Sequence, residues 1–175
     1  VLAIAGLYLL SSASGLFMIF VFATLYGFGK TFFWPTTLGV VSEQCPKGGA
    51  LTLNAIAGIG MLAVGILGGP VIGKMAEDAV KQSVIAETDE ETYGKISKDS
   101  TYFLGDYTAV ELAKVDSLKG DEKDTVKHSI QVGKQASLAS VAIFPVFMLI
   151  CYLALIFYFK GRGGYKPVEL EEGKS

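Results

Sequence analysis

Long runs of apolar residues, separated by polar turns and one long polar stretch, dominate the chain. The four longest runs cover residues 1–10, 16–42, 50–73 and 137–160, and each carries no more than one charged residue. A helix of about 20 apolar residues crosses the ~30 Å hydrocarbon core of a bilayer. The pattern therefore predicts a transmembrane region at 1–76, with helices at 16–42 and 50–73 and a partial helix at 1–10. It also predicts a last transmembrane helix at 137–160.

A polar stretch at 77–136 separates the last apolar run from the others. It holds thirteen carboxylates against eight lysines, so it is mildly acidic. Apolar residues are scattered through it, and Val126 and Ile130 fall on one side of a possible helix. We expect an insert outside the membrane, with one or two short helices that pack weakly on the membrane region. The expected fold is all-α: a multi-pass helix bundle with a hydrophilic insert before the last span.

The distribution of basic residues bears on the orientation in the membrane. Two spans separate the 43–49 turn from the 161–175 tail, so these lie on one side of the membrane and the insert lies on the other. Four basic residues favour a cytoplasmic tail and turn: Lys47, Lys160, Arg162 and Lys166. Four lysines flank the spans on the insert side: Lys74, Lys81, Lys127 and Lys134. Because an insert of about 60 residues is near the length at which the positive-inside count stops applying, we expect a cytoplasmic tail and an extracytoplasmic insert.

The composition agrees with a membrane protein and argues against other classes. Hydrophobic residues make up 51% of the chain and charged residues 18%, more apolar than an ordinary soluble domain. The net charge of −2 and the lack of a basic stripe argue against nucleic-acid binding. His128 is the one histidine, and the two cysteines are far apart. Because these cannot supply a metal-ligand set or a catalytic dyad, we expect no enzyme, metal site or cofactor.

Lys30 is the one charge in the 16–42 run and lies near its middle. A lysine stem does not reach a headgroup region about 15 Å away. A charge at the centre of a bilayer costs roughly 2.5–3.5 kcal/mol on insertion scales. We therefore expect Lys30 to face protein or a wet cavity, and it is the first candidate for a functional residue.

Three further residues fall on the Lys30 side of a continuous helix: Tyr26, Trp34 and Thr37. Together they would offer a cation, an indole and two hydroxyls to a polar substrate. The alternative is a structural role, in which Lys30 forms an ion pair between helices. Glu43 and Lys47, in the following turn, are better suited to a gating or orienting contact than to substrate binding.

Glycine and proline residues interrupt two of the apolar runs, 16–42 and 50–73. These residues predict close helix packing or kinks: Gly27, Gly29, Pro35, Gly65, Gly69, Pro70 and Gly73. Three of the glycines recur every four residues and would form one small-residue stripe on the 50–73 helix. The two prolines would each bend their helix.

The order of these features resembles the last three helices of a major facilitator superfamily transporter, preceded by the end of its ninth helix. The resemblance rests on Gly27-x-Gly29 with Pro35, on the turn Pro46-Lys47-Gly48-Gly49-Ala50, and on the Gly68-Gly69-Pro70-x-x-Gly73 helix end. The long insert departs from that family, whose corresponding loop is usually short. The resemblance implies twelve helices in inverted three-helix repeats, of which this chain would carry the last.

The resemblance also implies a function. It implies secondary active transport of a small polar solute by alternating access in the cell (inner) membrane, as a multi-pass protein. A proton or a sodium ion would be the coupling ion, and the remainder of the same transporter chain would be the partner. The alternative is a membrane-anchored sensing or interaction protein whose insert binds a partner outside the membrane.

Overall fold

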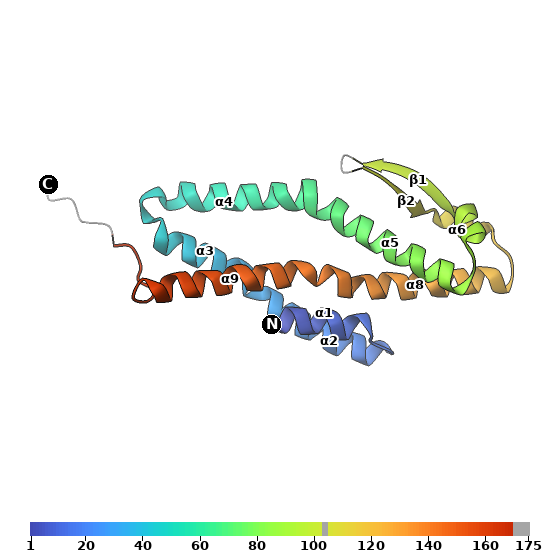
Figure 1. Cartoon of the computed structure of the whole chain (residues 1–175), viewed down its shortest axis with the longest axis horizontal. Helices are drawn as coiled ribbons and strands as arrows, with labels where there is room; N and C mark the ends of the chain where they lie inside the picture. The colour runs from blue at the N-terminus through green and yellow to red at the C-terminus, as the bar shows by residue number, and fades with distance from the viewer. Residues whose placement is uncertain (103–104, 170–175) are drawn as a thin grey trace.

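The computed structural model describes residues 1–102 and 105–169 and is an elongated, mostly helical molecule (Figure 1). Three helical stretches are long and apolar enough to cross a membrane: Leu16–Gln44, Pro46–Glu87 and Asp121–Gly161. The chain is therefore compatible with the membrane protein that the sequence predicts. The helices that build these stretches are α2 (Leu16–Thr31), α3 (Phe33–Gln44), α4 (Gly49–Ala63), α5 (Gly69–Glu87), α8 (Asp121–Val141) and α9 (Ile143–Gly161).

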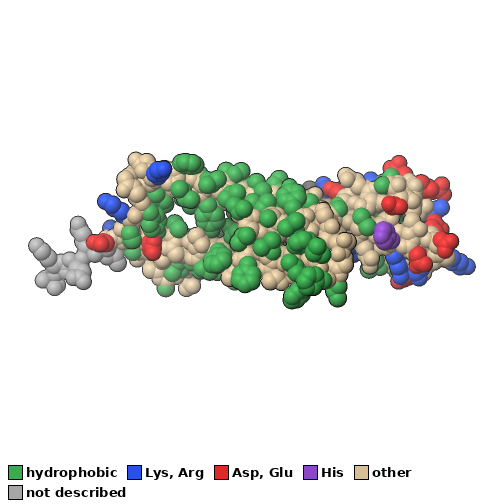
Figure 2. All heavy atoms as spheres, turned by 90° about the horizontal axis from the view of Figure 1, so that it is seen from below, with side chains coloured by type: hydrophobic (Ala, Val, Ile, Leu, Met, Phe, Trp, Pro, Cys, Tyr) green, Lys and Arg blue, Asp and Glu red, His purple; other side chains and the backbone are tan. Residues whose placement is uncertain are grey.

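Apolar side chains cover the middle of the molecule and charged side chains gather at its ends (Figure 2). The acidic and basic residues of the insert form one end, where His128 also lies. Basic and acidic side chains also lie near the other end (Figure 2). A band of apolar surface between two charged ends is the arrangement that a bilayer requires of a spanning bundle.

The predicted 16–42 helix is broken into α2 and α3 at Phe32, whose ψ is −13°. The break lies three residues before Pro35, which has no N–H to donate to the carbonyl of Thr31. The helical ladder resumes one residue later, where the Thr36 N–H donates to the Phe32 carbonyl at 3.2 Å.

The junction between α8 and α9 repeats this geometry. Its joining residue, Ala142, also has a ψ of −13°, and it lies three residues before Pro145. The Val146 N–H then donates to the Ala142 carbonyl at 3.1 Å. Each of these two spans is thus bent in the same way, by a proline at the third position of its second helix.

The helix before Pro70 is deformed in a different way from the helices at Pro35 and Pro145. The five residues before Gly69 form a π-helical turn, η2 (Val64–Gly68), which joins α4 to α5. A π-turn changes the hydrogen-bond register and so accommodates a proline that cannot donate. The axis of the α4–α5 helix bends visibly along this stretch (Figure 1).

Helices extend beyond the apolar runs on both sides of the insert. The helix expected to end at Gly73 continues as α5 to Glu87, and the possible helix that carries Val126 and Ile130 forms as part of α8, which begins at Asp121 and runs into the last apolar stretch. The charged residues beyond these points mark where the apolar surface ends, but they are good helix formers and do not end a helix. The α5 and α8 extensions lie against each other and carry the insert on a two-helix stalk (Figure 1).

The chain is mostly helical, as expected, but the insert adds a hairpin that the sequence did not predict, and its short helices pack more closely than expected. It contains α6 (Glu90–Ile96), α7 (Leu112–Ser117) and a two-stranded antiparallel hairpin of β1 (Ser97–Tyr102) and β2 (Gly105–Val110). It has its own apolar core, which joins both stalk helices to α6 and α7: Val80, Val84, Tyr93, Ile96, Val115, Val126 and Ile130. The insert is thus a small folded unit.

The partial N-terminal helix, α1 (Leu2–Ser11), lies antiparallel to α2 (Figure 1). Two glycines permit their close approach. A Cβ on Gly6 would lie 2.8 Å from the Tyr26 Cα, and a Cβ on Gly29 would clash with the Ala3 backbone nitrogen. The Gln135 side-chain amide of α8 donates to the Leu10 carbonyl at 3.0 Å, at the C-terminal end of α1.

Candidate functional site

The predicted site residues on α2 have different surroundings. The Tyr26 backbone faces Gly6 of α1, and the residue is half-buried. Lys30 is exposed on the last turn of α2, two residues before the break at Phe32. In the described part of the chain, the Lys30 side chain therefore points away from the neighbouring helices. It would contact lipid, solvent or protein from outside this chain.

Trp34 lies on α3 and faces α4. Its indole ring lies 3.5 Å from where a Cβ on Gly60 would stand, so the glycine makes room for the ring. The exposed fraction of Trp34 is 45%, which leaves part of the indole open. A flat aromatic surface of this kind can stack on a ring or pack on an apolar group.

Thr37 is tied to α9 through Tyr152, a residue that the sequence did not single out. The two hydroxyl oxygens are 2.9 Å apart, and the Tyr152 hydroxyl also lies within 3.2 Å of the Phe33 carbonyl. The Thr37 hydroxyl donates to that carbonyl at 2.9 Å. A half-buried tyrosine in a span needs a partner for its hydroxyl, and that requirement was the signal in the sequence.

An apolar hollow of about 270 Å³ adjoins this hydrogen-bonded group, between α3 and α9. Aliphatic, aromatic and sulfur-containing side chains line it: Val40, Val41, Phe147, Met148, Cys151 and Leu155. Thr37 and Tyr152 supply its polar atoms. The hollow suits an apolar side chain or a lipid tail better than a polar solute.

The four predicted residues are thus not gathered on one face. Tyr26 and Lys30 lie on α2, whereas Trp34 and Thr37 lie on α3, beyond the break. Tyr26 faces α1, Trp34 faces α4 and Thr37 bonds to α9. The prediction assumed a continuous helix, and the helical period is interrupted where Pro35 removes a donor.

Glu43 and its neighbours hold the C-terminal segment. The Tyr165 hydroxyl donates to the Glu43 carboxylate, and the Val168 N–H donates to the Glu43 carbonyl at 2.9 Å. The Gln44 side-chain amide donates to the Lys166 carbonyl at 3.0 Å. The hydrogen bond to Glu43 raises the pKa of Tyr165 above its ordinary value. The turn and the tail therefore lie at the same end of the molecule, and Lys47 is exposed beside them.

The glycine stripe of the 50–73 helix does not contact another helix in the described part of the chain. A Cβ on Gly65 or Gly73 would meet nothing within 4 Å, and one on Gly69 would meet the Val64 carbonyl of its own helix at 3.9 Å. Gly27 is also open, in contrast to Gly29. The stripe is thus available to a helix or ligand from outside the described residues.

The described residues contain no group of three or more histidine, cysteine or acidic side chains placed to hold a metal ion. Comparison with known proteins gives no relative: no family model, curated protein or solved structure matches the chain.

Proposed function

We propose that the chain is part of a secondary transporter that carries a small polar solute across a membrane by alternating access. One observation supports this proposal most directly. The span that holds the single intramembrane lysine is broken at Phe32, two residues after Lys30. Discontinuous helices near the bilayer midplane are a recurrent way of presenting free backbone groups to a solute or ion.

The chemistry at the break agrees with that role. The Thr31 carbonyl lacks its usual helical donor, because residue 35 is proline. A carbonyl and an ammonium group thus lie within two residues of each other in an otherwise apolar span. Both require a polar partner inside a membrane. A polar solute, a coupling proton or sodium ion, or an acidic residue of the remaining chain would supply it.

The π-turn η2 supports the proposal in a second helix. A π-turn and a proline together give α4–α5 a local bend without ending the helix. Alternating access needs such bends, since bundles rock about them while the solute site stays central. In this proposal Trp34, which packs on Gly60 of α4, lies between the two bent spans and senses their relative movement.

The folded insert favours a second candidate function, that of a membrane-anchored sensing or interaction protein. Its core includes Val80 from α5 and Val126 from α8, and these helices are continuous with the spans. A partner bound to the insert would therefore act on the spans through the two helices that lead into them. This candidate function requires no solute movement, so a measurement of solute movement distinguishes it from transport.

Solute uptake tests the transport proposal. The protein would be reconstituted in vesicles, and uptake of a panel of labelled sugars and organic anions would be measured with and without a proton or sodium gradient. We expect gradient-driven uptake that Lys30→Ala abolishes and Lys30→Arg partly retains, because arginine keeps the charge but not the geometry.

Lys119→Ala is the matched control, since Lys119 is an exposed lysine of the insert. Uptake that survives Lys30→Ala unchanged would reduce Lys30 to a structural role. Absence of uptake for every solute, with correct insertion of the protein, would contradict transport of these solute classes and favour the interaction protein.

A further inference from the structure

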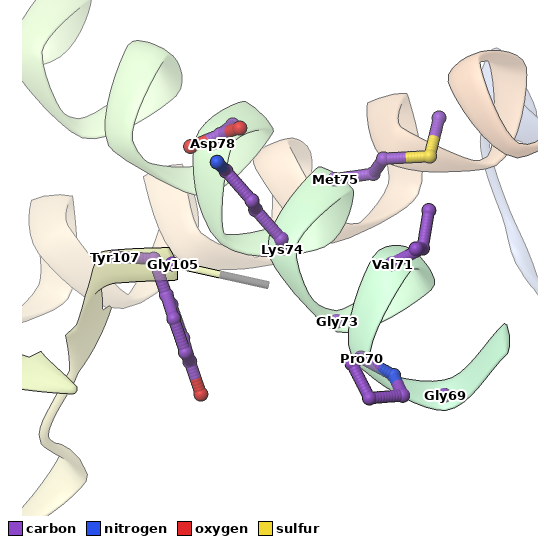
Figure 3. Close-up of a pocket in the computed structure, with 9 residues that line it drawn as sticks. All are labelled: Gly69, Pro70, Val71, Gly73, Lys74, Met75, Asp78, Gly105 and Tyr107. Carbon is purple, nitrogen blue, oxygen red and sulfur yellow. The ribbon is translucent and has the colours of Figure 1, made fainter. Parts of the chain in front are cut away.

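A cleft lies between the first three turns of α5 and strand β2 of the hairpin (Figure 3). Its volume is about 570 Å³. One side is apolar, with Pro70, Val71 and Met75, and the other is polar, with Lys74, Asp78 and Tyr107. In Figure 3 the Tyr107 ring projects into the open space opposite Pro70, and the Lys74 side chain extends toward Asp78. The cleft is therefore amphipathic.

The polar side continues into a second hollow of about 580 Å³ along the same helix and hairpin. The two hollows share Lys74, Asp78 and Tyr107. The second adds three charged side chains: Lys81, Asp99 and Asp106. Two lysines and three aspartates thus surround the polar part of the cleft, so its charge is mixed.

The walls of the cleft are fixed to each other. The Glu77 carboxylate of α5 accepts a hydrogen bond from the Val110 N–H of β2 at 3.0 Å. The Lys81 ammonium lies 5.6 Å from the centre of the Tyr93 ring, and the Tyr93 hydroxyl contacts Thr108 of β2. These contacts hold the hairpin at a set distance from α5 and keep the cleft open.

The cleft lies where the apolar surface ends. Residues 48–73 carry no charge, and Lys74 is the first charged residue after them. If the α4–α5 helix crosses a bilayer, Lys74 and Asp78 lie at the headgroup level, and Pro70 and Val71, which precede Lys74 by about one helical turn, lie at the top of the acyl chains. The apolar and polar sides of the cleft therefore match the two parts of a lipid molecule.

We propose that this cleft binds a phospholipid whose headgroup carries a primary ammonium beside its phosphate, with Lys74 on the phosphate and Asp78 on the ammonium. The mixed charge of the cleft disfavours a purely anionic lipid, because the three aspartates would repel it. A primary ammonium donates hydrogen bonds to carboxylates, whereas a choline group cannot. A choline site would instead need a cage of aromatic rings, and Tyr107 is a single ring.

The lipid would also connect the insert to the membrane. It would contact α5 on the membrane side and the hairpin on the outer side, so its binding would order the hairpin against the bilayer surface. This inference does not depend on transport, since a lipid site would serve an interaction protein equally well.

Lipid selection in nanodiscs tests the proposal. The protein would be placed in nanodiscs with equal amounts of phosphatidylethanolamine, phosphatidylcholine and phosphatidylglycerol, and the lipids retained after release would be measured by native mass spectrometry. We expect retained lipid enriched in phosphatidylethanolamine. Asp78→Asn loses the charge-assisted hydrogen bond to the ammonium and would lower the enrichment about tenfold. Lys74→Ala loses the bond to the phosphate, which all three lipids share, and would lower the total amount of retained lipid about tenfold.

Two exposed residues that line neither hollow provide matched controls, Lys119→Ala and Asp124→Asn. These variants would keep the enrichment of the unaltered protein. Retained lipid with the bulk composition would overturn the proposal. So would enrichment of phosphatidylcholine or phosphatidylglycerol instead, or equal losses in the control variants. Because Lys74 and Asp78 are exposed, neither substitution threatens the fold, and circular dichroism would verify this.

Discussion

Gly133 of α8 lies so close to α5 that a Cβ added to it would stand 2.6 Å from the Val80 Cα. Both residues are buried, and this contact is where the two stalk helices approach each other most closely among the glycine positions of the insert. A small residue at this point is therefore a condition of the insert's core, to which Val80 belongs.

Gly133→Ala should weaken the stalk. The added Cβ meets backbone atoms, which cannot rotate away, so the helices must separate at a cost of about 1–3 kcal/mol. The better helix propensity of alanine offsets at most about 1 kcal/mol of this loss. Amide hydrogen exchange of α5 and α8 would measure the effect as faster exchange. Gly94→Ala, at an open helical position of α6, should leave exchange unchanged or slow it.

Ile96→Ala should destabilise the insert more strongly. Ile96 is fully buried between the stalk and the short helices, and its truncation leaves a cavity that costs about 2–5 kcal/mol. Leu112→Ala removes a similar side chain that is 61% exposed and should have little effect. The two variants would be compared by the melting temperature of the insert, followed by near-ultraviolet circular dichroism. Equal losses in the two variants would contradict the assignment of Ile96 to the core.

The Thr37–Tyr152 hydrogen bond should couple α3 to α9. In a double-mutant cycle of Thr37→Val and Tyr152→Phe, we expect a coupling energy of about 0.6–1.7 kcal/mol, the range for hydrogen bonds between membrane helices. Unfolding in mixed micelles would supply the free energies. Thr36→Val is the control, because the Thr36 hydroxyl bonds to the Phe32 carbonyl of its own helix. Additive losses for Thr37 and Tyr152 would show that the bond does not form.

Acid should fray the start of α6. The Asp89 carboxylate caps this helix by accepting the Thr92 N–H at 2.6 Å, and this hydrogen bond lowers the pKa of Asp89 below 3.8. Because the folded-state pKa is lowered, the stabilisation is present above pH 3.8 and is lost as the pH falls through the folded value. Helical signal of the insert, followed across acid pH, would show the loss.

Asp89→Asn keeps an acceptor at the cap and should remove this part of the pH dependence. The exposed Asp124→Asn should leave the acid transition unchanged. A transition in Asp89→Asn that matches the unaltered protein would mean that another carboxylate causes it.

The long helices could be predicted from sequence because hydropathy and length suffice to identify them. The apolar runs gave three candidate spans, and Pro35 and Pro70 marked the places where two of them deform. The ends of the helices were not predictable in the same way. Hydropathy falls at Lys74, but lysine, glutamate and alanine continue a helix as well as apolar residues do, so α5 runs on to Glu87.

The insert and the site were harder for a different reason. Strand β1 begins Ser-Lys-Asp-Ser, which has low strand propensity, and pairing with β2 determines its conformation. Likewise, the Thr37–Tyr152 contact joins residues 115 positions apart, and no local sequence pattern predicts it. The helix break at Phe32 then divides residues whose spacing alone would have placed them together.

The positions of the core residues along the chain determine when the insert can fold during synthesis. Val80 and Val84 precede the hairpin, while Val126 and Ile130 follow it, and all four share one core. That core cannot close until the ribosome has made residue 130. Its closure would then hold α5 against α8, and through them the two long apolar stretches to which these helices belong.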